Sequence, residues 1–293
     1  MIGWYYLVLI SSVLMGISTV AEKKMLKAEH ATQYSTAFSW MIVLVSIILI
    51  PFMDLNVTAY EWILVMVTGL LGAITYLLSA RIFKHGTISA TSPLISALPI
   101  FFTVLFAYFF LGEHLSALQY VGIAGILLVT YLILFGRGKD GKAAKEIESN
   151  KYLYMLVAFA VVSAIGGVVG RYLLADVYAN INVFTYMILS QLFTALFLTA
   201  FIIAKYDGVR EIVRTIGKDS RPILLIVLLT VGYRLTYYFA LHVAPVSIAS
   251  PLRNTFMVII TVLSGGAMFK EHSIKRKLML SIVMLLFAYL LTL

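Results

Sequence analysis

The sequence predicts an all-α integral membrane protein in which ten transmembrane helices form two inverted five-helix repeats around a central cavity. Three observations lead to this fold class. Hydrophobic residues make up 62% of the 293 residues and charged residues only 12%, whereas a typical soluble domain has about 25% charged residues. Long apolar segments recur along the whole chain. The two halves of the sequence also resemble each other.

Ten segments are long and apolar enough to cross a bilayer. A helix needs roughly 20 apolar residues to span a hydrocarbon core about 30 Å thick, and a backbone in lipid must satisfy its own hydrogen bonds. The predicted spans are 4–24, 33–53, 61–81, 90–111, 117–136, 152–174, 183–204, 222–242, 247–268 and 276–292. No basic n-region precedes the first span and no A-x-A-like site follows it, so we expect a membrane span there and no cleaved signal peptide.

Two polar connectors interrupt the apolar pattern. The longer one, at residues 136–151, reads GRGKDGKAAKEIESNK and lies near the middle of the chain. We therefore divide the chain into a first repeat at 1–137, a cytoplasmic linker at 138–151 and a second repeat at 152–293. The other connector, at 205–221, carries apolar residues at helical spacing, which predicts a short amphipathic helix in the membrane interface.

An internal repeat links the two halves. Residues 85–114 align without a gap on residues 243–272, at a separation of 158 positions, with nine identities in 30 positions. The identical residues of the first copy are Ser89, Ser92, Pro93, Leu94, Thr103, Val104, Leu105, Glu113 and His114. Each half then holds five spans, an odd number, so the second half must enter the membrane in the opposite sense. Inverted repeats of this kind are typical of secondary transporters, whose solute site lies near the midplane between the repeats.

The arrangement of these motifs resembles the drug/metabolite transporter superfamily, in its EamA-like branch. The resemblance rests on ten spans in two halves, on Ser-Pro-Leu at 92–94 and 250–252, and on Gly112 and Glu113 at the end of the fourth span. It implies transport through a cavity lined by both halves. It leaves the substrate open, because members of the superfamily carry amino acids, sugars, nucleotide conjugates, choline-like cations and drugs. The second half departs from the pattern, since Lys270 stands where the first half has glycine.

The basic residues predict the orientation. All but three of the 22 lysines and arginines fall in loops on one side of the predicted bundle, and positively charged loops stay in the cytoplasm. We therefore expect a multi-pass protein of the cell membrane with cytoplasmic basic loops and both termini outside. The net charge of +9 then reflects membrane orientation, so we expect membrane lipid and no nucleic acid as a partner.

The three remaining basic residues, Arg171, Arg234 and Arg253, lie within predicted spans. A charge at the bilayer centre costs about 2.5–3.5 kcal/mol on insertion scales, so such a residue normally faces protein or a wet cavity. All three belong to the second half, and the repeat places Tyr76 and Ile95 opposite Arg234 and Arg253. This break in symmetry is where we expect solute-specific chemistry.

We predict that Arg234 and Arg253 bind a carboxylate or phosphate of the solute, because a planar guanidinium can donate two parallel hydrogen bonds. Further expected substrate-binding residues are Tyr76, Arg171, Gln191, Tyr233, Tyr237 and Asn254. Structural roles are the alternatives: Arg171 can pair with Asp176 or reach the interface, and Arg253 can bond a carbonyl freed by Pro251.

Two further polar residues have open roles. Glu22 lies near the end of the first span beside Lys23 and Lys24. It is a candidate coupling carboxylate, with an interfacial ion pair as the alternative. Gln191 lies midway through the seventh span, where it can line the cavity or form a hydrogen bond to another helix.

Proline and glycine mark expected points of bending and close packing. Pro93 and Pro251 remove the same backbone hydrogen bond in both halves, and Pro99 has no counterpart, so we take all three as candidate hinges. Three glycines within 166–170 predict the close approach of another helix, either inside the monomer or in a homodimer.

The function expected from the sequence is secondary transport of a small polar or anionic metabolite, of amino acid or organic acid type, by alternating access. A cation or multidrug exporter of the same superfamily is the first alternative, but it predicts a carboxylate deep in the bundle and no mid-span position has one. A membrane-embedded enzyme or a receptor is the other. No G-x-S-x-G, H-E-x-x-H or paired mid-span carboxylates occur, so we expect no enzyme. Without cysteines or histidine pairs at metal-binding spacing, we expect no metal or other cofactor.

Overall fold

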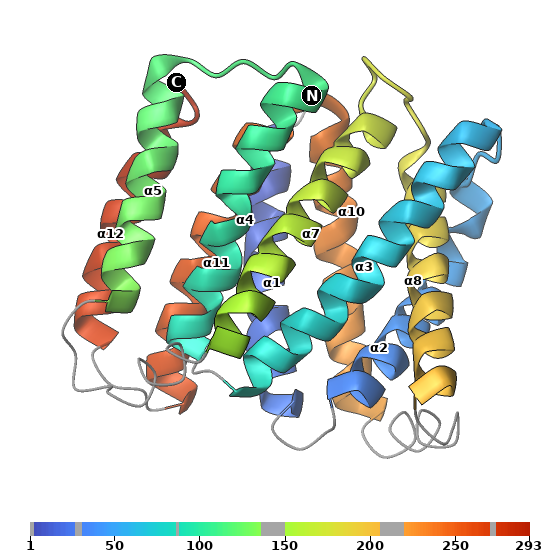
Figure 1. The fold of residues 1–293 in the computed structure, drawn as a ribbon, viewed down its shortest axis with the longest axis horizontal. Helices are drawn as coiled ribbons and strands as arrows, with labels where there is room; N and C mark the ends of the chain where they lie inside the picture. Colours follow the sequence, from blue (N-terminus) through green and yellow to red (C-terminus); the bar gives the residue numbers. More distant parts are fainter. Residues whose placement is uncertain (1–2, 27–30, 86–87, 136–149, 206–219, 270–273) are drawn as a thin grey trace.

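The computed structural model describes residues 3–26, 31–85, 88–135, 150–205, 220–269 and 274–293, and these residues form a helical bundle without strands (Figure 1). Each of the ten predicted segments overlaps one helix. The helices are α1 (Trp4–Leu26), α2 (Ala31–Ser46) with the 3-10 segment η1 (Ile47–Phe52), α3 (Ala59–His85), α4 (Ile88–Leu111), α5 (Ala117–Phe135), α7 (Asn150–Leu174), α8 (Val183–Lys205), α10 (Ser220–Val243), α11 (Val246–Phe269) and α12 (Ile274–Leu290). The predicted linker and interfacial helix lie almost entirely outside the described residues.

The described helices have the lengths and surfaces of a multi-pass membrane protein. Eight of them are long and apolar enough to cross a membrane, and Ala117–Ile133 is a shorter apolar helix. Helix α12 has 17 residues and begins with Ile-Lys-Arg-Lys, which shortens its apolar part. Large apolar side chains face outward, with Ile48 and Phe110 each 75% exposed. Lipid solvates such a surface, whereas water would drive it to associate.

The repeat seen in the sequence sets the helix boundaries. Helix α4 covers 88–111 and α11 covers 246–269, so both ends of α11 follow those of α4 by 158 positions. Helices α3 and α10 end at 85 and 243, again 158 apart. The described chain is therefore built from two repeats in the same register as the sequence alignment.

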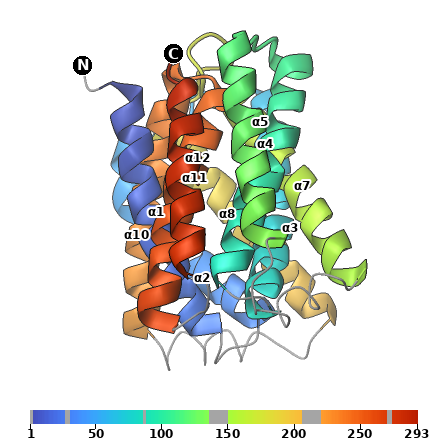
Figure 2. The same ribbon diagram turned by 90° about the vertical axis from the view of Figure 1, so that its left-hand side faces the viewer.

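Helix packing follows the same correspondence. Helix α1 packs on α10 and α11, and its counterpart α7 packs on α3 and α4. Three further contacts join corresponding helices directly, namely α2 with α8, α4 with α11 and α5 with α12. Figures 1 and 2 show α5 and α12 side by side at one edge of the bundle. The start of α1 and the end of α12 lie at one end of the bundle, called the terminal end below (Figures 1 and 2).

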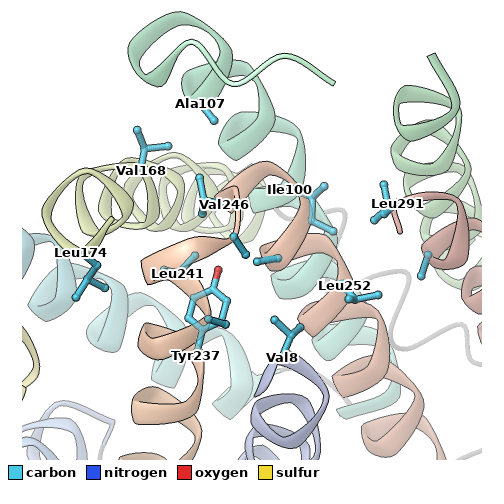
Figure 3. Packing of buried hydrophobic residues seen from close by; sticks show 14 of the residues in the cluster. Val8, Ile100, Ala107, Val168, Leu174, Tyr237, Leu241, Val246, Leu252 and Leu291 are labelled. Carbon is cyan, nitrogen blue, oxygen red and sulfur yellow. The ribbon is translucent and has the colours of Figure 1, made fainter. Parts of the chain in front are cut away.

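Apolar side chains and a few hydrogen bonds hold the helices together. In Figure 3, Val8, Tyr237 and Leu252 approach one another from α1, α10 and α11, within one buried cluster. Between α4 and α11, the hydroxyls of Ser92 and Thr261 lie 2.7 Å apart. Apolar burial gains little when the alternative solvent is lipid, so close packing and interhelical hydrogen bonds of this kind drive helix association in membranes.

Candidate solute-binding cavity

A cavity of about 270 Å³ lies inside the bundle. Its walls come from both repeats, with residues of α1, α2, α3 and α4 facing residues of α7, α8, α10 and α11. This volume is close to the lower end of the range of small-molecule sites, about 300–1,000 Å³.

Charged and hydroxyl groups line much of this cavity. Among the described residues, its charged members are Glu22, Arg234 and Arg253. Five tyrosines contribute to the wall, namely Tyr76, Tyr186, Tyr233, Tyr237 and Tyr238. Serine and threonine hydroxyls from α1, α3, α7 and α8 complete the polar surface. Two guanidinium groups and one carboxyl group give the described lining a formal excess of positive charge.

Arg234 is held in place by both repeats. Its Nη1 donates to Oε1 of Gln191 at 2.5 Å, and its Nη2 donates to the hydroxyl of Tyr76 at 2.6 Å. Gln191 is fully buried and donates in turn to the hydroxyl of Ser39 on α2 at 2.6 Å. Gln191 therefore hydrogen-bonds to other helices, as one of its two predicted roles requires, and it is not among the residues that line the cavity. Both terminal nitrogens of Arg234 therefore already donate a hydrogen bond within the protein.

Arg234 and Tyr76 are also repeat equivalents, 158 positions apart. Asn254 and Ser96 form a second such pair, since Nδ2 of Asn254 donates to the Ser96 carbonyl at 3.0 Å. When two units are related by a two-fold axis, equivalent residues can touch only beside that axis. Both contacts therefore mark the boundary between the repeats. Asn254 is buried there, joining α11 to α4, and is not among the residues that line the cavity.

Arg253 has a different environment from Arg234. Its Cζ lies 3.7 Å from the centre of the Tyr237 ring, in cation–π contact. Its Nε is buried, and within the described part of the chain this nitrogen has no hydrogen-bond partner. The expected bond to a carbonyl freed by Pro251 is not found among these residues. A cation–π contact involves the face of the guanidinium and uses none of its N–H donors.

Glu22 faces the same cavity from α1. Arg234 contributes to the wall of the same cavity. The neighbouring Lys23 is buried, and its Nζ donates to the carbonyl of Phe83 on α3. Among the described residues, no ion pair of Glu22 with Lys23 or Lys24 is found, and the Glu22 side chain contributes to the cavity wall.

Arg171 lies outside the cavity. Its Nε is 3.6 Å from Oε1 of Glu113, and its Nη1 donates to the carbonyl of Leu241. The ion pair thus forms with Glu113 and not with Asp176, which the sequence had suggested as its partner. The side chain of Arg171 is 7% exposed. We conclude that Arg171 connects helices near the terminal end.

The glycines at 166–170 contribute to the cavity itself. A Cβ added to Gly166 would lie 3.8 Å from Leu71, and one added to Gly167 would lie 3.9 Å from Val246, both ordinary contacts. Neither of these two glycines is therefore needed to make room for a neighbouring helix within the described chain. Both line the cavity. Only Gly170 makes room for a neighbour, because a Cβ there would lie 2.8 Å from the Tyr186 hydroxyl.

The three prolines lie inside continuous helices beside the cavity. Pro93 and Pro251 occur at the same position of α4 and α11, and Pro99 follows one and a half turns later in α4. Ile95 and Arg253, each two residues after a matched proline, line the cavity. A change of bend at these prolines would therefore move the cavity wall.

Comparison with known proteins bears on this architecture. The model of the EamA-like transporter family matches residues 2–135 and 150–293, one stretch for each repeat. A solved structure described as "Crystal structure of protein" aligns with a TM-score of 0.64 at 17% sequence identity, over 99% of this chain and 97% of that chain. At this identity the likeness concerns the fold alone. No curated protein sequence matches the chain significantly.

Proposed function

Because the chain belongs to the EamA-like transporter family, whose members are membrane transporters of the drug/metabolite transporter superfamily, we propose that it carries a small polar or anionic metabolite of amino acid or organic acid type. One observation carries this substrate class. Arg253 lines an internal cavity, the Tyr237 ring lies against its guanidinium, and its terminal nitrogens donate no hydrogen bond to another described residue. A carboxylate is the group that such a guanidinium binds best, through two parallel hydrogen bonds.

The charges around the cavity favour this class over a cationic drug. A cation at 4 Å from a guanidinium would be repelled by about 4 kcal/mol at an effective dielectric constant of about 20. The wall holds two arginines against one glutamate. An amino acid suits all three groups, with its carboxylate on Arg253 and its ammonium toward Glu22. Arg234, already bonded to Gln191 and Tyr76, adds positive potential without giving up its partners.

Alternating access between two inverted repeats is the proposed mechanism. Five helices per repeat reverse the direction of the second repeat, and the location of both chain ends at the terminal end agrees with ten passes. The contacts between equivalent residues, Arg234 with Tyr76 and Asn254 with Ser96, support a two-fold relation between the repeats. Such halves can exchange conformations, so that states open to either side have similar energies. Pro93, Pro251 and Pro99 are the proposed hinges.

The orientation is a further part of the proposal. The helix ends that the predicted basic loops would join lie opposite the terminal end, and the positive charge of those loops favours the cytoplasm. Both termini would then face outward from the cell membrane.

A binding screen tests the substrate class. The purified protein would be heated with organic acids, amino acids and quaternary amines at equal concentrations. A ligand present at 100 times its Kd stabilises the folded state by about 2.7 kcal/mol. We expect stabilisation by acids or amino acids, and its loss in Arg253→Gln. Arg276→Gln is the matched control, because Arg276 is exposed and donates to the Leu132 carbonyl away from the cavity. Stabilisation by amines alone, retained in Arg253→Gln, would reverse the assignment.

A further inference from the structure

Glu113 joins the first repeat to the second at the terminal end. Its Oε1 accepts a hydrogen bond from the N–H of Val246 at 3.1 Å, and its Oε2 accepts from the N–H and hydroxyl of Ser247 at 3.0 and 2.5 Å. Val246 and Ser247 are the first residues of α11. The first N–H groups of a helix have no partner within it, and the helix dipole favours a negative charge beside them. A side chain of the first repeat thus caps a helix of the second.

The end of α4 is shaped for this contact. Helix α4 stops at Leu111, and Gly112 follows with φ of +63°. Glycine adopts this left-handed conformation without the strain that a side chain would cause, and it commonly ends helices in this way. The N–H of Glu113 donates back to the carbonyl of Ala107 at 3.2 Å. The turn is therefore closed, and it directs the Glu113 carboxylate toward α11.

Arg171 extends the cluster to two more helices. From α7, it pairs with Glu113 and donates to the carbonyl of Leu241 near the end of α10. The side chains of Arg171 and Glu113 are 7% and 8% exposed. Gly170 and Leu241, which adjoin these contacts, line the cavity. The Glu113 carboxylate therefore joins the end of α4 to α7 and α11, and Arg171 adds a bond to α10, next to residues that line the cavity.

We propose that Glu113 is a positioning residue that latches the two repeats together and holds the cavity closed at the terminal end. Opening toward that end requires α4 to separate from α7 and α11, which breaks the cap and the ion pair together. Water entering from that end would solvate both charged groups, so the latch can reopen and close in each transport cycle. The inference rests on the proposed alternating access, but it concerns a different site from the solute contacts.

Cysteine labelling tests the latch directly, because the chain contains no cysteine. Ser163, which lines the cavity from α7, would be replaced by cysteine in sealed vesicles. A membrane-impermeant maleimide would then be added on the side of the terminal end. We expect Glu113→Gln to raise the labelling rate on the order of tenfold, since a minor open state is commonly populated at about 0.1–10%. Ser247→Ala, which removes one of the three hydrogen bonds, should give a smaller rise.

Glu61→Gln is the matched control. Glu61 caps its own helix, where Oε2 accepts from the N–H of Thr58 at 2.7 Å. It therefore tests the loss of a capping carboxylate without loss of a contact between repeats, and we expect no change in labelling. An unchanged rate in Glu113→Gln, or an equal rise in Glu61→Gln, would overturn the latch.

A second cysteine distinguishes opening from unfolding. Ala195 is fully buried on α8 and does not line the cavity. If Glu113→Gln exposed a cysteine at Ala195 as much as one at Ser163, the variant would be unfolding and the latch would be rejected. Labelling requires no solute, so the two proposals can fail separately. If Glu113→Gln raises the labelling rate but the protein binds neither organic acids nor amino acids, only the proposed substrate class is rejected.

Discussion

The bond between Arg234 and Gln191 offers a quantitative test of how the cavity is built. Arg234→Met keeps an apolar side chain of similar length but removes both donors. Oε1 of Gln191 would lose its partner at 2.5 Å while staying fully buried. The hydroxyl of Tyr76 would also lose its donor, but Tyr76 lines the cavity, where water can replace the guanidinium. The expected cost is therefore mainly that of one buried unsatisfied acceptor, about 1–3 kcal/mol.

A double-mutant cycle isolates this contribution. Gln191→Leu removes the acceptor, so the double variant leaves no unsatisfied carbonyl at Gln191. The double variant should then lose less stability than the sum of the single variants, with a coupling energy of about 0.5–3 kcal/mol. The free energy of unfolding would be measured by titrating the detergent-solubilised protein with a denaturing detergent. Strict additivity would refute the proposed support of Arg234 by Gln191.

Thr130→Val provides the control cycle with Arg234→Met. The Thr130 hydroxyl donates to the Ile126 carbonyl of its own helix, α5, which contributes no described residue to the cavity. We expect the two losses to add to within about 0.5 kcal/mol.

Four further predictions concern helix packing, the cavity and the orientation in the membrane. Gly69→Ala should cost about 1–3 kcal/mol through overpacking, because its Cβ would lie 2.4 Å from that of Phe193. Gly166→Ala should leave the unfolding free energy unchanged but weaken binding of the largest solutes, since the new methyl enters the cavity. Equal destabilisation by Gly69→Ala and Gly166→Ala would contradict this difference. Glu22→Gln should weaken amino acid binding about tenfold or more, a loss of about 1.4 kcal/mol, while leaving organic acids unaffected. If calorimetry showed that Glu22→Gln weakens amino acids and organic acids equally, the proposed contact between Glu22 and an ammonium group would be rejected. A C-terminal reporter that fluoresces only in the cytoplasm should stay dark, and a bright fusion would reverse the orientation.

Helix positions could be predicted from the sequence because they depend on local composition. The fourth predicted span, 90–111, corresponds to α4 at 88–111, and the ninth, 247–268, corresponds to α11 at 246–269. In lipid, an apolar segment of this length has few alternatives to a helix. The separation of 158 positions between repeats also reappears in the helix boundaries. These features require no knowledge of which helices touch.

The candidate site could be predicted only in part. Arg234, Arg253, Tyr76, Tyr233 and Tyr237 do meet in one cavity. Charge within an apolar span was the signal that singled out the arginines. That signal is the same for a residue that lines a cavity and for one that connects helices, so it could not separate these roles.

The contacts that decide these roles join distant parts of the chain. Glu113 bonds Ser247, 134 positions away, and Arg171 bonds the carbonyl of Leu241, 70 positions away. The sequence carried signs of their importance, since Glu113 belongs to the repeated Glu-His pair. No feature of the sequence indicated which residues Glu113 and Arg171 would contact.

The sequence by itself determined that this chain is a membrane bundle of two related halves, and it located the charges that lie within the apolar segments. Hydropathy sets how deep each residue lies along its helix, because the bilayer thickness is constant. Only the tertiary structure decided that Arg253 lies against the Tyr237 ring in the cavity wall, that Arg234 is held by Gln191 and Tyr76, and that Arg171 pairs with Glu113. The physical reason is that rotation and tilt of a helix in the membrane are set by packing against its neighbours, and no local property of the sequence specifies them.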